Sequence, residues 1–314
     1  MKFLRKAMRT AGLPGLGLAL AGFMLLSGLG STKVLAAETT GDQAAPPIKA
    51  FRVCADPDNP PLSTQDRTGF ENKIAQMFAK DLGVPLRYTW FPQRMGFVRN
   101  TLRDNDTADG KYKCDIIMGV VQGFELAATT KPYYRSAWAM VYEKGKGLDQ
   151  LHSLADLAAM PAAKRDKLRI GAFDRSSIVT WLSKHGMLNQ LVPYQSMSGD
   201  VHAFPGQIIE SDLVNGKIDL TFVWGPIAGY FAKQLEKTRH VHLAVIPLKS
   251  QKDIPFDYNI CMAVRYGDKT RMRLLNHLID KHHAEIDKIL TQYGVPLLPI
   301  DYSKSKEKEH HGDD

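Results

Sequence analysis

The sequence predicts an α/β protein built from two doubly wound lobes that are joined by a two-strand hinge. Two short apolar runs, within 51–63 and 114–119, each break directly into turn residues. An amphipathic segment at 69–83 and an apolar strand at 86–91 lie between them. Alternating strands and helices of this kind form a doubly wound lobe, in which the loops at the carboxyl ends of the strands make the binding face. The same pattern restarts at Leu168, which predicts the second lobe.

The elements of the first lobe follow from apolar spacing. Apolar residues recur with the i, i+3, i+4, i+8 spacing of a helix with one buried face, namely at Ile74, Met77, Phe78 and Leu82. Gly83 ends this helix. We expect the next elements to be a strand at 86–91, a helix at 94–103, a strand at 114–120 and a first hinge strand at 137–142.

The second lobe repeats this alternation. We expect strands at 168–172, 218–224 and 242–247, and helices at 178–185, 207–216 and 226–235. The apolar run 257–264 is the second hinge strand, and a closing helix at 274–290 packs back on the first lobe. The predicted lobes are therefore 48–137 plus 258–300, and 143–252.

The first 36 residues are predicted to be a secretory signal peptide. A basic start is followed by an apolar stretch at 11–30 and by small residues at 34–37. The mature protein is then expected to be periplasmic and not anchored in a membrane. The charged tail at 301–314 lacks apolar periodicity, and we expect it to be disordered.

The charge of the mature chain argues against nucleic acid as a partner. The signal segment carries five of the 41 Lys and Arg residues and none of the 33 acidic ones, which leaves a net charge near +3. Nucleic-acid binding requires clustered basic residues along one face. Metal binding is not expected either, because adjacent histidines such as His282 and His283 point about 100° apart on a helix. No cofactor is predicted.

Three cysteines in an oxidising compartment indicate one disulfide and one free thiol. Cys54 ends the first strand and Cys114 begins the third, and such strands are neighbours in a doubly wound lobe. A Cys54–Cys114 disulfide is therefore the preferred prediction. The alternative is that these cysteines are free thiols that pack as small hydrophobic groups. Cys261 lies in an apolar strand and is expected to stay reduced.

The first group of candidate binding residues follows the second strand, beside the predicted cleft. It consists of Trp90, Gln93, Arg94 and Arg99. Arginine pairs with carboxylates through two hydrogen bonds and stacks on aromatic rings, so this group could recognise an anion or a protein partner. In the alternative, Trp90 packs inside the lobe and the arginines form ion pairs within it.

The second group lies in the second lobe. Arg175, Ser176 and Ser177 precede a predicted helix, and a helix start with hydroxyl groups and an arginine can bind an anion. In the alternative, Ser176 or Ser177 only caps the helix. Trp224 ends a strand at the cleft, where it could line an aromatic pocket with Trp138 or belong to the core between the lobes.

Several longer runs indicate a family. The segments 69–71, 114–117, 131–134 and 289–294 resemble landmarks of periplasmic solute-binding proteins of ABC transporters, which implies a type II periplasmic binding protein fold. The segments 52–57, 90–102 and 223–231 resemble the methanol-oxidation protein J family more specifically. That resemblance implies a periplasmic accessory protein that assembles or activates a PQQ-dependent methanol dehydrogenase, which would be its protein partner.

Two other functions remain open from the sequence. One is a substrate-binding receptor of an ABC transporter with a small ligand in the interlobe cleft. An amino acid is a poor ligand, because the loop 119–126 has no Arg or Lys and 224–226 has no acid to pair with the ends of a zwitterion. The other is a dehydratase of the same fold that recruits Glu71, Glu125 or Asp174. No catalytic motif singles out one of these three residues, so we expect a protein that is not an enzyme.

Overall fold

The structure describes most of the chain beyond the predicted signal peptide. The computed structural model describes residues 48–196, 200 and 202–303. The predicted signal peptide, 1–36, and residues 304–314 of the predicted tail lie outside the described residues. No helix of the described part is both long enough and apolar enough to cross a membrane.

Strands and short helices alternate along the chain. The first elements are β1 (Phe51–Ala55), β2 (Asp58–Asn59), β3 (Ser63–Thr64), α1 (Phe70–Asp81), β4 (Leu86–Trp90), α2 (Phe97–Asn100), β5 (Ile116–Val121) and β6 (Ala128–Glu143). The next are α3 (Leu154–Ala159), α4 (Ala162–Arg165), β7 (Ile170–Phe173), α5 (Ser177–Lys184), η1 (Leu188–Gln190) and β8 (Leu191–Tyr194). The last are η2 (Ile208–Leu213), β9 (Leu220–Trp224), α6 (Gly225–Arg239), β10 (Leu243–Pro247), β11 (Asp257–Val264), α7 (Lys269–Lys281) and α8 (His283–Gln292).

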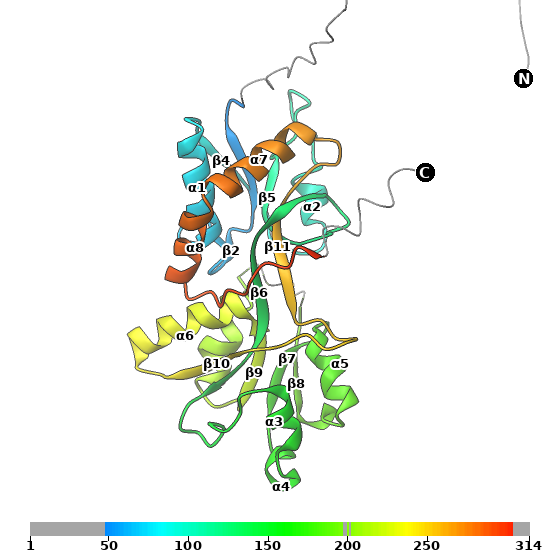
Figure 1. Ribbon diagram of the computed structural model, residues 1–314, viewed down its shortest axis with the longest axis vertical. Helices are drawn as coiled ribbons and strands as arrows, with labels where there is room; N and C mark the ends of the chain where they lie inside the picture. The colour runs from blue at the N-terminus through cyan, green and yellow to red at the C-terminus, as the bar shows by residue number, and fades with distance from the viewer. Residues whose placement is uncertain (1–47, 197–199, 201, 304–314) are drawn as a thin grey trace, which may run out of the picture. The chain divides into compact units, whose positions relative to one another are not determined.

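One long strand, β6, belongs to both halves of the main sheet (Figure 1). The strand order is β4-β1-β5-β11-β6-β9-β7-β8, with β10 also paired to β6. Residues 128–137 of β6 pair with β11, and residues 138–143 pair with β9 or β10. Parallel strands β4-β1-β5 lie on one side of this antiparallel centre, and the parallel strands β9-β7-β8 lie on the other. The predicted α/β class is confirmed.

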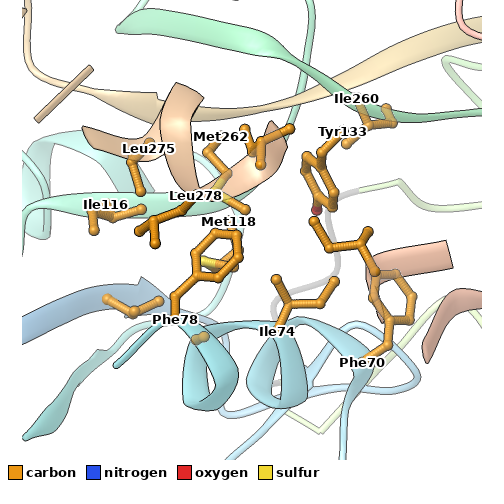
Figure 2. Close-up of a cluster of buried hydrophobic side chains, with 14 of the residues drawn as sticks. Phe70, Ile74, Phe78, Ile116, Met118, Tyr133, Ile260, Met262, Leu275 and Leu278 are labelled. Carbon is orange, nitrogen blue, oxygen red and sulfur yellow. The ribbon is translucent and has the colours of Figure 1, made fainter. Parts of the chain in front are cut away.

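The core of the first half of the sheet fixes the position of α1. Figure 2 shows Phe70, Ile74 and Phe78 of α1 in one buried cluster with Ile116 and Met118 of β5. All five side chains are at most 2% exposed. Burial of each such side chain contributes about 1.5–3 kcal/mol. This packing holds the first turn of α1 against β5, which matters for the binding site described below.

In the second half of the main sheet, hydrophobic side chains and helices cover both faces. In β6, Met140 packs into one hydrophobic cluster, and its neighbours Ala139 and Val141 pack into another. Successive side chains of a strand point to opposite faces, so the two clusters lie on opposite sides of the sheet. Trp181 of α5 belongs to the first cluster and Phe231 of α6 to the second. A sheet that is buried on both faces is typical of α/β proteins.

Three predicted helices differ from the structure, and one strand was not predicted. The helix expected at 94–103 is only the short α2, because Gly96 has a left-handed φ of +88° and Thr101 leaves the helical region. The helix expected at 274–290 is two helices, α7 and α8, which are interrupted at His282. The helix expected at 207–216 is the shorter π-helical segment η2. Strand β8 was not predicted, since Pro193 interrupts its pattern, but proline is tolerated there because β8 is at the sheet edge.

The structure has the preferred disulfide, between Cys54 and Cys114. Both cysteines lie in a hydrophobic cluster with Phe97 and Val98 of α2. Cys261 is free and buried in the same cluster, where burial raises the pKa of its thiol to about 12. A thiol with such a pKa is protonated, and therefore unreactive, at neutral pH.

Candidate binding site

Most of the binding residues predicted from the sequence line one of two separate pockets. Gln93 and Arg94 line a pocket of about 690 Å³, which we call the polar pocket. A second pocket, of about 440 Å³, is called the aromatic pocket; it is lined by Leu62, Glu71, Gly119, Val120, Val121, Tyr134, Trp138, Arg175, Ser176, Ser177, Trp224, Tyr258 and Ile260. Trp90 and Arg99 line neither pocket.

The aromatic pocket forms where strands end and helices begin. Val121 is the last residue of β5, Trp224 is the last residue of β9, and Ser177 is the first residue of α5. In open α/β sheets, ligands bind outside the carboxyl ends of the strands. The structure therefore brings Trp224 and the Arg175–Ser177 group into one pocket, as their positions after strands suggested.

Aromatic rings form one wall of this pocket. Trp138 of β6 and Trp224 of β9 are register partners, with ring centroids 6.5 Å apart and planes at 67°. Tyr258 of β11 lies 6.1 Å from Trp224. Tyr134 is 2% exposed, and burial raises the pKa of its hydroxyl, so that it remains neutral at physiological pH. The wall thus combines flat apolar surfaces with an uncharged hydroxyl group.

The start of α5 forms another part of the pocket. Ser176 is the N-cap residue of α5 by position, but its hydroxyl donates a hydrogen bond to the Phe173 carbonyl at 2.6 Å. The Ser176 side chain makes no capping hydrogen bond to the first N–H groups of α5. The capping alternative is therefore wrong for the Ser176 hydroxyl. Arg175 is exposed at this pocket.

Glu71 places a buried carboxyl group in the aromatic pocket. The residue is 7% exposed, and its Oε1 atom has no hydrogen-bond partner among the described residues. Burial, and secondarily the charge of Asp56, raise the pKa of Glu71 to about 8. The carboxyl group is therefore mostly protonated at neutral pH. Neither Glu125 nor Asp174 lines either pocket, so Glu71 is the one of the three dehydratase candidates that does.

Glu71 was predicted only as a possible dehydratase acid and not as a binding residue, although its position in the helical pattern carried a signal. Glu71 precedes Ile74, Ala75 and Phe78 by three, four and seven residues, which places it on the buried face of α1. An acid on the apolar face of a helix is either paired or functional, because burial of an unpaired charge is costly. The helical pattern could therefore have pointed to it.

The polar pocket has most of its charged groups engaged within the protein. Asp56 accepts hydrogen bonds from the backbone N–H groups of Asp58, at 2.9 Å, and Gln93, at 2.6 Å. The guanidinium group of Arg94 donates to the carbonyl of Asp200. Asp212 accepts from the Tyr194 hydroxyl at 2.7 Å. Groups that are already paired gain less from a ligand, so the aromatic pocket is the stronger candidate site.

Trp90 and Arg99 have other surroundings. The Trp90 ring stacks on Tyr88, with centroids 4.4 Å apart and planes at 11°, and it packs against the hydrophobic core. This geometry favours the alternative in which Trp90 packs inside the first lobe. Arg99 is exposed on α2.

The fold defines the class of protein. No protein-family model matches the chain. The structure is similar to the crystal structure of MxaJ from Methlophaga aminisulfidivorans MPT, with a TM-score of 0.65 and 24% identity over 79% of this chain and 100% of that chain. It is also similar to the periplasmic binding protein XoxJ from Methylobacterium extorquens AM1, with a TM-score of 0.62. The protein therefore has the type II periplasmic binding protein fold.

The sequences define the family more narrowly. The chain is 34% identical to XoxJ, over 80% of this chain and 100% of that one. It is 26% identical to the protein MoxJ of Methylorubrum extorquens over 277 residues, which are 84% of this chain and 87% of that protein. The chain belongs to the methanol-oxidation protein J family, as the segments 52–57, 90–102 and 223–231 indicated.

Proposed function

We propose that the protein is a periplasmic accessory protein that assembles or activates a PQQ-dependent methanol dehydrogenase, on a solute-binding-protein scaffold. The observation that supports this most strongly is the 34% identity with the periplasmic binding protein XoxJ over that protein's whole length. The family resemblance implies an association with quinoprotein methanol dehydrogenases. A direct contact with the dehydrogenase is the expected mode of action.

The lining of the aromatic pocket supports a role other than amino-acid uptake. Gly119, Val120 and Val121 line it where amino-acid receptors hold the ligand carboxylate with a basic residue, and Trp224 stands where they have an acid. A zwitterion there would lack both usual partners, and the two charged side chains of the lining replace them poorly at neutral pH, because Arg175 is exposed and Glu71 is mostly protonated. The proposed role is not catalytic, because XoxJ, to which the chain is 34% identical, is a periplasmic binding protein.

The proposal is tested with purified components. The mature protein is titrated into the purified methanol dehydrogenase of the same organism, and the complex is measured by biolayer interferometry. We expect a saturable complex that Arg99→Ala weakens several-fold, because Arg99 is exposed in the family-specific run 90–102. The matched control is Arg87→Ala, an exposed arginine of the same lobe outside that run. Absence of a complex at micromolar concentrations contradicts the proposal.

A second test uses the periplasm of methanol-grown cells. Affinity capture of the tagged protein, followed by mass spectrometry, should recover the large subunit of the dehydrogenase. Recovery of a transporter permease without any dehydrogenase would instead support the ABC-transporter receptor.

A further inference from the structure

The aromatic pocket contains an acid without a countercharge. Glu71 is 93% buried, and its Oε1 atom makes no hydrogen bond within the described part of the chain. Oε1 packs against Gly119, where an added Cβ would lie 2.2 Å from this oxygen. Gly119 therefore leaves the space that the carboxyl group occupies. An unpartnered buried polar atom at the edge of a cavity is incomplete without a ligand, since its desolvation is not offset.

The groups that face Glu71 offer no positive charge. Asp56, after β1, acts on it electrostatically and favours its neutral form. Tyr88 of β4 and Tyr133 and Tyr134 of β6 are the other titratable neighbours, and burial raises the pKa of each. These tyrosines stay neutral over the pH range in which Glu71 titrates. The side of the pocket around Glu71 therefore favours a cation.

Arg175 is the one basic residue of the pocket lining within the described chain. Its side chain is exposed, so water and salt screen its charge. Glu71 is buried, where charges interact more strongly than they do in water. The buried acid, and not the exposed base, therefore dominates the recognition of charge inside the pocket.

Aromatic rings form the rest of the pocket wall that a ligand beside Glu71 would contact. The Trp224 ring contacts the rings of Trp138 and Tyr258, and all three side chains are partly accessible. The faces of aromatic rings attract cations, and methylated ammonium ions are recognised by such surfaces. The volume of about 440 Å³ is in the range of sites for small organic molecules.

We propose that the aromatic pocket binds a small organic ammonium ion, with its positive charge against the Glu71 carboxylate and its alkyl groups against the rings of Trp138, Trp224 and Tyr258. Binding stabilises the ionised form of Glu71 and displaces its proton to solvent. The free protein holds that proton with a pKa of about 8, so ligand affinity increases with pH until Glu71 is ionised without the ligand. This inference does not depend on the proposed dehydrogenase partner.

The first experiment compares a cation with its neutral isostere. Choline and 3,3-dimethylbutan-1-ol have the same shape, and the charge of choline is permanent, so pH acts only on the protein. Each is titrated into the full protein by calorimetry at pH 6, 7, 8 and 9. We expect the affinity for choline to rise about tenfold for each unit by which the pH increases toward 8, with a plateau above pH 8. The alcohol should bind at least tenfold more weakly than choline at pH 9, without a pH dependence.

Variants assign the effect to Glu71. Glu71→Gln keeps the shape of the side chain and should abolish the pH dependence of choline binding, with a loss of at least tenfold at pH 9. The matched control is Glu125→Gln, which should bind like the wild type, because Glu125 is exposed and lines neither pocket. If Glu71→Gln does not fold, Gly119→Ala serves instead, since the added methyl group displaces the carboxyl group.

Two results overturn the inference. One is equal affinity for choline and the alcohol, which would mean that the pocket recognises apolar shape alone. The other is choline binding that is undetectable at millimolar concentration throughout this pH range. An unchanged pH dependence in a folded Glu71→Gln or Gly119→Ala protein would likewise exclude Glu71 as the recognition group.

Discussion

Two of the buried carboxyl groups, those of Asp115 and Glu71, have opposite surroundings. Asp115, which is 2% exposed, accepts hydrogen bonds from Arg52 at 2.8 and 2.9 Å and from Arg265. Arg271 approaches it to 3.3 Å. Glu71 is 7% exposed and has no basic partner among the residues that the structure describes.

The same physical effect acts on both acids with different outcomes. Burial favours the neutral form of Asp115, but Arg52, Arg265 and Arg271 outweigh this effect and hold its pKa below the ordinary value. Nothing offsets burial at Glu71, whose pKa rises to about 8. The presence of basic neighbours, more than the degree of burial, therefore decides whether a buried carboxyl group is ionised. Asp115 thus belongs to a structural ion cluster with three arginines. Glu71, in contrast, can change its protonation state when a ligand binds.

The largest expected effect is the removal of Asp115. Asp115→Ala leaves three arginines close together without a countercharge. Because an uncompensated buried charge is strongly unfavourable, the free energy of unfolding should fall by about 3–5 kcal/mol. Urea denaturation at pH 7 measures this loss. Asp109→Ala is the control, because Asp109 pairs with Lys111 on the surface, and its effect should be much smaller. Equal effects for the two variants would contradict the assignment.

The second prediction concerns pH and Glu71. Between its ordinary pKa of 4.5 and about 8, Glu71 is protonated in the folded protein and ionised in the unfolded chain. Stability from this group is therefore present at low pH and is lost as the pH rises, by roughly 3 kcal/mol between pH 5 and pH 8. Glu71→Gln cannot ionise and should lack this loss. Denaturation curves at four pH values, with Glu125→Gln as the control, decide the matter. Parallel pH profiles for Glu71→Gln and the wild type would show that Glu71 is not a buried neutral acid.

The smallest effect is expected for Arg52→Ala. Two arginines still compensate Asp115 in this variant, so the free energy of unfolding should fall by about 1–2 kcal/mol. An acid with a lowered pKa stabilises the protein above its unfolded pKa and loses this contribution as the pH falls. Removal of Arg52 raises the pKa of Asp115, so acid unfolding should begin at a higher pH. An acid titration followed by circular dichroism checks this shift. No shift would mean that Arg265 and Arg271 alone set the charge of Asp115.

The sequence predicted most of the fold because each element carries its own periodicity. The apolar spacing of α1 and the apolar run of β11 are local patterns, and the structure has both elements close to the expected positions. Local patterns did not predict the break at His282 between α7 and α8. They also gave no reason to expect the edge strand β8, whose pairing with β7 depends on a distant segment.

The candidate site was predicted in part for the same reason. The rule that ligands bind at the ends of strands placed Arg175, Ser176, Ser177 and Trp224 at the cleft, and all four line the aromatic pocket. Trp90 also ends a strand, yet its ring packs on Tyr88. The side to which a terminal side chain points depends on the neighbouring strands, which a single segment does not encode.

The sequence by itself determined the α/β class and indicated the family, because these depend on local periodicity and on runs of adjacent residues. It only favoured the pairing of Cys54 with Cys114, which the structure has. Only the tertiary structure decided which buried acid is paired. Asp115 meets Arg265 and Arg271 through the return of the chain in β11 and α7. Glu71 meets Gly119 of β5 and, within the described part of the chain, no cation. Desolvation and charge act through space, so the protonation state of these two residues depends on neighbours that are remote in the chain.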